Sequence, residues 1–216
     1  MHLNLPTLAS VLLVAFGGAL SAPVLYRGFS RRGKGVKYES NFLIQRAPQL
    51  ASGLAAVLIT FSFLGFNHIL KGHGVAPILT LAPLMPRVAG LIVAWIGVAL
   101  LLCGLIFMIG GWYSLGECFS TDAELLDGQT VRKNGLLKYV MHPAYSGIIQ
   151  SLLGASIAAL SPASALTVIF LVAPLWLKRA KYEEELLIHT FGQGYMDYAQ
   201  ELGWRRLVPS FFPIGV

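Results

Sequence analysis

The chain has 216 residues, of which 56% are hydrophobic and only 12% are charged. A soluble globular domain carries about 25% charged residues, so the composition excludes that class and indicates a polytopic membrane protein. The formal net charge of +6 is typical of basic cytoplasmic loops in such proteins, and we expect no nucleic-acid partner.

Uncharged stretches follow one another along the chain and predict membrane-spanning helices, since about 20 apolar residues cross a bilayer core. They run over residues 3–26, 47–70, 88–116 and 143–177. As one helix, the last stretch would rise ~52 Å, which exceeds a core of ~30 Å. Ser161-Pro162 divides it into two short spans that form a tight helical hairpin.

The sequence therefore predicts an all-α integral membrane fold with five transmembrane helices and an amphipathic C-terminal helix that begins near Lys178. We expect one domain over residues 1–216, with variable spans in 1–111 and the motif-bearing half in 112–209. His68 and His73 have no Cys or carboxylate neighbours that could complete a metal site, so we expect none.

The distribution of Lys and Arg predicts the orientation of the spans. The loop after the first span contains six basic residues, whereas the turn at Ser161 contains none. Five spans then place the N-terminus outside and the C-terminus in the cytoplasm. The loop before His142 and the tail that carries Glu183 share the cytoplasmic face.

The segment from Gly135 to Gly147 stands where a charged loop meets the last uncharged stretch, and it contains His142-Pro143. Proline suits the first turn of a helix, where its missing N–H would have no partner anyway. The remaining free N–H groups of such a helix start can meet an anionic group. Tyr139 and Tyr145 can stack or hydrogen-bond there, although aromatic residues are also common at membrane interfaces.

A second block follows the last span and reads Arg179-x-x-x-Glu183-Glu184, Phe191-Gly192-x-x-Tyr195-x-x-Tyr198 and Arg206-x-x-Pro209. Successive helical residues are separated by ~100°, so Glu183, Glu184 and Glu185 cannot all face one way. Glu183 and Glu184 can each look toward the protein, and we assign Glu185 to solvent. A carboxylate this close to a span is costly unless it is paired or functional.

The order and spacing of the two blocks resemble the isoprenylcysteine carboxyl methyltransferase family and its phospholipid-methyltransferase relatives. Trp112-x-x-Leu115-Gly116 adds a weaker match, so the resemblance covers residues 112–209. It implies S-adenosylmethionine as the methyl donor, which enters from the cytoplasm, and an acceptor that enters from the bilayer. It also implies catalytic roles for Glu183 and Glu184, and a donor-binding set of Tyr139, His142, Pro143, Tyr145, Gly147, Glu183 and Glu184.

We expect one composite pocket, with the segment from His142 to Gly147 as one wall and the helix from Glu183 to Tyr198 as the other. Met141 stands where the family usually has Arg. This predicts a less anionic acceptor, or that the charge comes from Arg132, Lys133 or Lys138.

Several acceptors and functions remain open at this stage. The acceptor can be an isoprenylcysteine carboxylate, a phospholipid amine, or a small lipophilic thiol or amine. A membrane sterol reductase that uses NADPH resembles the same C-terminal architecture. A non-enzymatic scaffold or transporter is the third alternative, and it predicts no cofactor binding.

Overall fold

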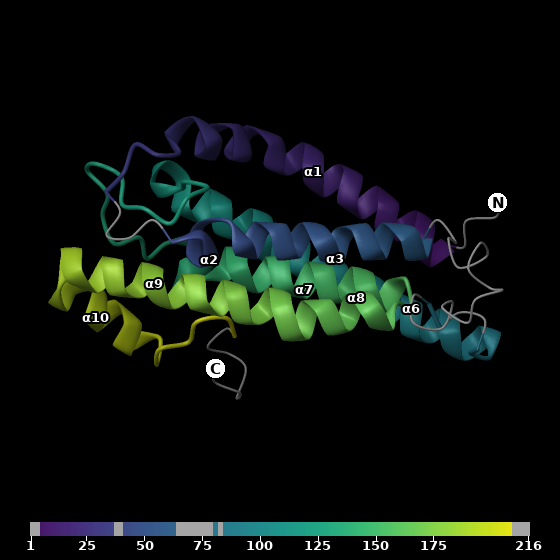
Figure 1. Ribbon diagram of the computed structural model, residues 1–216. Coiled ribbons are helices and arrows are strands. Elements are labelled where there is room, and N and C mark those ends of the chain that lie inside the picture. Colours follow the sequence, from purple (N-terminus) through teal and green to yellow (C-terminus); the bar gives the residue numbers. More distant parts are fainter. Residues whose placement is uncertain (1–4, 37–40, 64–79, 82–83, 209–216) are drawn as a thin grey trace. The chain divides into compact units, whose positions relative to one another are not determined.

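The computed structural model describes residues 5–36, 41–63, 80–81 and 84–208. Within these ranges the fold is helical, as the composition predicts, and its strand-like pairing is a single antiparallel bridge between Val36 and Leu125. The helices appear in Figure 1 in sequence colours.

The helices follow the order of the predicted apolar stretches. They are α1 (Leu5–Arg31), α2 (Phe42–Gln45), α3 (Ala47–Phe63), α6 (Arg87–Leu115), α7 (Pro143–Ala158), α8 (Pro162–Thr167), α9 (Ala173–Phe191) and α10 (Gln193–Glu201). Short 3-10 turns cover Gly116–Cys118 and Gly135–Lys138, and a π-helical turn, Val168–Val172, joins α8 to α9.

Three helical stretches in the described part of the chain are long and apolar enough to cross a membrane: Leu5–Arg31, Arg87–Cys118 and Pro162–Phe191. Helix α3 is a shorter apolar helix. The second predicted span continues to residue 70, and its end lies outside the described residues, as do His68 and His73. The chain is therefore a helical membrane protein.

The last uncharged stretch is broken where Ser161-Pro162 predicts a division. Helix α7 ends at Ala158 and α8 begins at Pro162, which occupies the first helical turn. Between them Leu160 has a φ of 50°, a left-handed conformation that costs energy for a residue with a Cβ. Ser161 fixes this turn, since its backbone N–H donates to the Ser156 carbonyl at 2.9 Å and its hydroxyl accepts from Ser62 at 2.9 Å.

The described fold contains two compact units. Of the described residues, one comprises 5–17, 49–63, 80–81, 84–105 and 149–174, and the other comprises 18–36, 41–48, 106–148 and 175–208. We call them the small-residue unit and the polar unit, after the contacts described next.

In the small-residue unit, glycines let α6 and α7 approach each other closely. A Cβ at Gly97 would collide with the backbone of Ala158, and one at Gly104 would collide with the backbone of Ser151. From the other helix, a Cβ at Gly154 would collide with the backbone of Leu101. Small residues commonly permit such backbone contact between membrane helices.

In the polar unit, the chain reverses after α9 at Gly192, whose φ is 52°. Helix α10 then returns beside the end of α9 (Figure 1). Its buried face includes Tyr195, Tyr198 and Ala199, which pack in one hydrophobic cluster with Met141. The Tyr198 hydroxyl donates to the Leu137 carbonyl at 2.8 Å, so α10 is also fastened to the segment that precedes His142.

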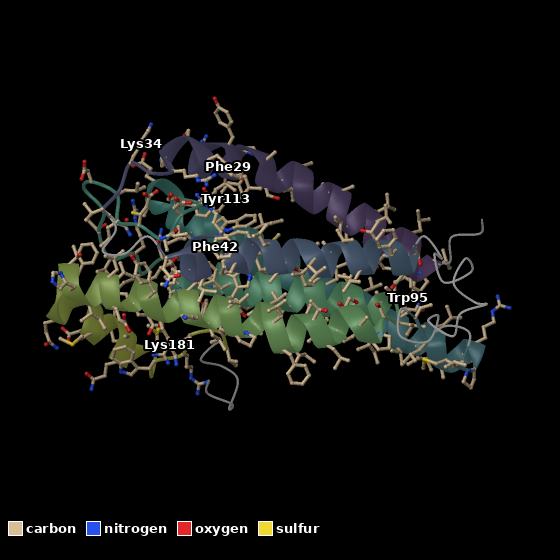
Figure 2. The ribbon with its side chains drawn as sticks, in the orientation of Figure 1. Phe29, Lys34, Phe42, Trp95, Tyr113 and Lys181 are labelled. Atoms are coloured by element: carbon tan, nitrogen blue, oxygen red, sulfur yellow. The ribbon has the colours of Figure 1, made fainter. Side chains whose placement is uncertain are left out.

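Aromatic side chains stand on the exposed surface of the same unit, where Figure 2 labels Phe29, Phe42 and Tyr113. All three are exposed. The Tyr113 hydroxyl donates to the Leu20 carbonyl at 2.9 Å. Exposed aromatic residues of this kind are expected on a surface that meets lipid.

Candidate active site

The site lies in the polar unit and begins with the backbone at His142. The Met141 N–H donates to the Arg205 carbonyl at 2.9 Å, and the His142 N–H donates to the Arg206 carbonyl at 3.0 Å. One turn further along α7, the Ser146 hydroxyl donates to the Leu207 carbonyl at 2.5 Å. These bonds fasten the segment 205–207 against the start of α7 and bring Arg206 to the site.

The His142 side chain, which is buried, contacts Glu184. The imidazole Nε2 lies 3.2 Å from Glu184 Oε1, and Arg206 Nε donates to the same carboxylate at 2.9 Å. Glu184 is only 3% exposed. A carboxylate so deeply buried requires both charge and hydrogen-bond partners, and this pair of neighbours supplies them.

A second network joins Tyr145 to Glu183. The Tyr145 hydroxyl donates to Glu183 Oε1, and the same hydroxyl accepts from Arg179 Nε at 3.0 Å. Arg179 Nε also lies 3.1 Å from Glu183 Oε1. The Tyr145 ring stacks on the His142 imidazole with centroids 5.3 Å apart and an interplanar angle of 3°. The two networks are therefore in direct contact.

Arg179 is the most deeply buried cation of this site, with 2% of its surface exposed. Its guanidinium lies over the rings of Tyr145 and Trp176, at 5.8 and 5.5 Å from their centroids. Arg179 Nη2 donates to the Thr121 carbonyl at 3.0 Å. Among the described residues, Arg179 Nη1 and Thr121 Oγ1 have no hydrogen-bond partner. One buried donor and one buried hydroxyl therefore lack a hydrogen-bond partner, and they belong to two residues that contact each other.

The structure brings together most of the residues singled out from the sequence. His142, Tyr145, Glu183 and Glu184 meet directly, Pro143 begins α7, and Gly147 is buried on that helix. Tyr139 follows the 3-10 turn Gly135–Lys138, and its side chain is 45% exposed. Glu185, which lies outside the motif pattern and was assigned to solvent, is exposed.

Three functional candidates were not included in the predicted site: Arg179, Trp176 and Arg206. The sequence does contain a signal for two of them, because Arg179 and Arg206 belong to the same motif block as Glu183 and Glu184. A pair four residues apart on a helix normally indicates a weak surface ion pair. The burial of Arg179 is what changes that interpretation.

Met141 packs in the hydrophobic cluster of α10 and is 5% exposed. Of the basic residues considered as substitutes for the usual Arg, Lys133 pairs with Glu201 at 3.4 Å, and Arg132 Nε donates to Cys118 Sγ at 3.4 Å. The contact with Cys118 raises the pKa of Arg132. The cations that reach the two glutamates are instead the buried Arg179 and the partly exposed Arg206.

The phenols of α10 stay neutral. Burial raises the pKa of Tyr195 well above its ordinary value, and the nearby Glu184 charge raises it further. Burial likewise raises the pKa of Tyr198. Both tyrosines therefore act as hydrogen-bonding and packing groups near the site, and neither supplies a phenolate at neutral pH.

The site combines two carboxylates, two guanidinium groups, an imidazole and stacked aromatic rings. Its fixed charges balance, because Glu183 and Glu184 offset Arg179 and Arg206. Such a site can hold a ligand that carries both positive and negative groups. It contains positioned polar groups but, among the described residues, no cluster of three or more His, Cys, Asp or Glu that could hold a metal ion.

Comparison with known proteins associates this site with a family. Residues 95–189 match the model of the isoprenylcysteine carboxyl methyltransferase (ICMT) family. This confirms the resemblance expected from the two motif blocks. The matched segment contains His142, Tyr145, Arg179, Glu183 and Glu184, whereas Arg206 lies beyond its end.

A curated relative agrees with the family match. The chain is 33% identical over 79 residues to "Protein-S-isoprenylcysteine O-methyltransferase B" of Arabidopsis thaliana. That match covers 37% of this chain and 37% of the relative, so it spans just over a third of the relative's length.

A solved structure resembles the fold over a greater length. It is described as the eukaryotic intramembrane Ras methyltransferase ICMT, determined without a monobody. The superposition has a TM-score of 0.54 at 20% sequence identity, and it covers 93% of this chain and 67% of the other. This likeness supports the helical membrane fold.

Proposed function

Since residues 95–189 carry the pattern of the ICMT family, we propose that this chain is a membrane methyltransferase that uses S-adenosylmethionine. The acceptor is a lipid-borne or small lipophilic molecule at the cytoplasmic membrane face. The observation that carries this proposal is the direct contact of the two motif blocks, His142 with Glu184 and Tyr145 with Glu183.

The residues present fit the chemical groups of the proposed donor. S-adenosylmethionine has a zwitterionic methionine tail, a sulfonium, a ribose and an adenine. The two glutamates suit its positive groups, and the unpartnered Arg179 Nη1 suits an anionic or hydroxyl oxygen. Buried donors and acceptors without partners are rare in folded proteins and often mark a binding role.

The donor supplies an already activated methyl group on its sulfonium. The task of the protein is then chiefly to hold donor and acceptor in line, which can supply a large part of the rate enhancement. We assign donor binding to His142, Glu183 and Glu184, together with the helix start at Pro143 and the aromatic face of Tyr145. A base is needed only for an acceptor that binds in its protonated form, and Glu183, which is partly exposed, is the better placed of the two carboxylates.

The acceptor class follows from the membrane setting. A lipid-attached group can keep its chain in the bilayer while its head reaches the site. The candidates are an isoprenylcysteine carboxylate, a phospholipid amine, and a lipophilic thiol or amine. The name of the Arabidopsis relative favours the first of these.

We further propose five spans with an external N-terminus and a cytoplasmic C-terminus, in a single domain. The basic residues after the first span support this orientation. An accessibility tag inserted near Gly35 and another after Val216 should both report the cytoplasm, and a tag before Leu3 should report the opposite side. A cytoplasmic tag at both ends would contradict five spans.

Calorimetry on the purified protein in detergent tests the proposed activity. We expect S-adenosylhomocysteine to bind and NADPH not to bind. His142→Ala and at least one of Glu183→Gln and Glu184→Gln should weaken binding about ten- to a hundred-fold, which corresponds to the loss of one hydrogen bond to a charged group.

Glu185→Gln is the matched control, because it removes the same charge from an exposed neighbour on α9. It should leave binding unchanged. Binding of NADPH alone would instead indicate a reductase, and binding of neither ligand would indicate a scaffold or transporter.

A further inference from the structure

The proposed function leaves unexplained the buried acidic residues of the segment 119–125, which follows α6. Asp122 is 5% exposed and Glu124 is 7% exposed. Buried carboxylates are costly unless they are paired and hydrogen-bonded, so each of these two has a structural or functional reason to be there.

Glu124 fastens the segment to the loop after α1. Its carboxylate accepts hydrogen bonds from the backbone N–H groups of Gly33 at 2.9 Å and Gly35 at 3.1 Å, and from the Ser120 hydroxyl at 2.5 Å. The antiparallel bridge between Val36 and Leu125 continues this contact, with N–H to O distances of 2.8 and 3.1 Å.

Asp122 and Ala123 fasten the segment to the residue directly after α1 and to the end of α2. The Asp122 carboxylate pairs with Arg32 at 3.1 Å and with Arg46 at 3.0 Å. The Gln45 side chain donates to the Ala123 carbonyl and accepts from the Ala123 N–H, each at 3.0 Å. The basic residues of this loop therefore hold a buried segment in addition to favouring an orientation in the membrane.

Directly before these anchored positions, Thr121 reaches the site. Its carbonyl accepts from Arg179 Nη2, and the Nε of the same guanidinium contacts both the Tyr145 hydroxyl and Glu183. Because a guanidinium is planar and rigid, the position of Nη2 sets the direction of Nε. The carbonyl of Thr121 thus helps to determine where Tyr145 and Glu183 are held.

We propose that residues 120–124 are a positioning element of the active site: Asp122 and Glu124 place the Thr121 carbonyl, which orients Arg179 and through it Tyr145 and Glu183. None of the five residues is assigned to touch the reacting atoms. The inference rests on the proposed function for its catalytic meaning, whereas the coupling itself is a property of the fold.

Trp176 provides a native reporter of this coupling, since its ring lies 4.6 Å from the Tyr145 ring and 5.5 Å from the Arg179 guanidinium. We would label the full-length protein with 5-fluorotryptophan and record its fluorine NMR spectrum in detergent without any ligand. The Trp176 resonance is identified by its loss in Trp176→Phe. Trp95 on α6, in the other unit, serves as the internal reference.

We expect Glu124→Gln and Arg179→Lys to shift or broaden the Trp176 resonance and to leave that of Trp95 in place. Asp127→Asn is the matched control, because it removes a charge from the same loop at an exposed position, and it should change neither resonance. If Glu124→Gln proves unstable, Arg46→Gln replaces it, since its partly exposed side chain contacts Asp122.

An unmoved Trp176 resonance in a folded Glu124→Gln or Arg46→Gln protein would overturn the proposal. A second measurement separates this from the proposed function: the same variants should bind S-adenosylhomocysteine about tenfold more weakly, and Asp127→Asn should bind normally. Absence of binding in the wild type would refute methyl transfer, while the fluorine spectra would still decide the coupling. Shifted spectra with unchanged affinity would refute the role in the active site.

Discussion

Different kinds of contact stabilise the interior of each of the two compact units. In the small-residue unit, Gly97, Gly104 and Gly154 bring helix backbones together, and hydroxyl hydrogen bonds such as that of Ser62 with Ser161 add to this packing. In the polar unit, buried charges are paired, Arg179 with Glu183 and Glu184 with Arg206. Lipid offers no hydrophobic drive for helix association, so close packing must stabilise the first unit. The second unit keeps costly charges, as a functional site does.

Arg179→Met should produce the largest loss of stability and would break the polar unit selectively. It leaves the Glu183 carboxylate and the Thr121 carbonyl without their cation, and removing one partner of a buried ion pair typically costs about 3–5 kcal/mol. Unfolding in mixed micelles, followed by circular dichroism, measures the change. Lys181→Met is the control on the exposed side of the same helix and should change the unfolding free energy by less than about 0.5 kcal/mol.

Gly154→Ala tests the small-residue unit with a single added methyl group. The new Cβ would meet the backbone of Leu101, and overpacking of this kind costs about 1–3 kcal/mol. Gly53→Ala on α3 is the matched control, since nothing lies within 4 Å of its added Cβ. It should stabilise the helix by up to ~1 kcal/mol. Equal effects at the two positions would show that close packing is not what holds this unit.

Ser62→Ala removes the hydrogen bond between Ser62 and Ser161, a polar contact inside the small-residue unit. We expect a loss of about 0.5–1.5 kcal/mol in the unfolding free energy. Thr60→Ala removes an exposed hydroxyl that bonds to its own helix at the Ala56 carbonyl, and its effect should be smaller. A loss comparable to that of Arg179→Met would erase the distinction between the units.

Lys133→Ala tests whether exposed charges matter in the polar unit. Its partner Glu201 is 66% exposed and Lys133 itself is 45% exposed. Exposed ion pairs contribute about 0–1 kcal/mol, and added salt should reduce even that contribution. Unfolding at low and high ionic strength measures it. A loss above that range, or one that resists salt, would mean that burial does not decide which charges stabilise the unit.

The sequence predicts the helical class and the division at Ser161-Pro162 because both follow from local patterns. Uncharged length predicts spans, and a proline at the first turn predicts a helix start. The proximity of His142 to Glu184 could also be predicted from the sequence, because a helical hairpin returns the chain to the same level of the membrane. These inferences need only composition, spacing and one rule of topology.

The rest of the site depends on tertiary contacts that no periodicity in the sequence reveals. Arg179 looks like half of a weak surface pair until its burial is known, and Asp122 and Glu124 look like members of a solvated acidic loop. Their partners, Arg46 and Gly33, are more than 70 residues away in the chain. Pairing over such separations requires the fold itself, so the sequence alone missed these residues.

The burial of Met141 beneath α10 has an evolutionary consequence. An arginine introduced there alone would place a charge in the hydrophobic cluster of Tyr195, Tyr198 and Leu202, and a buried charge is strongly destabilising unless it is paired and hydrogen-bonded. Substitution at this position is therefore epistatic with α10. Replacement of Met by Arg at position 141 is tolerated only when the facing residues change as well. A library that varies the positions one at a time would not recover this combination.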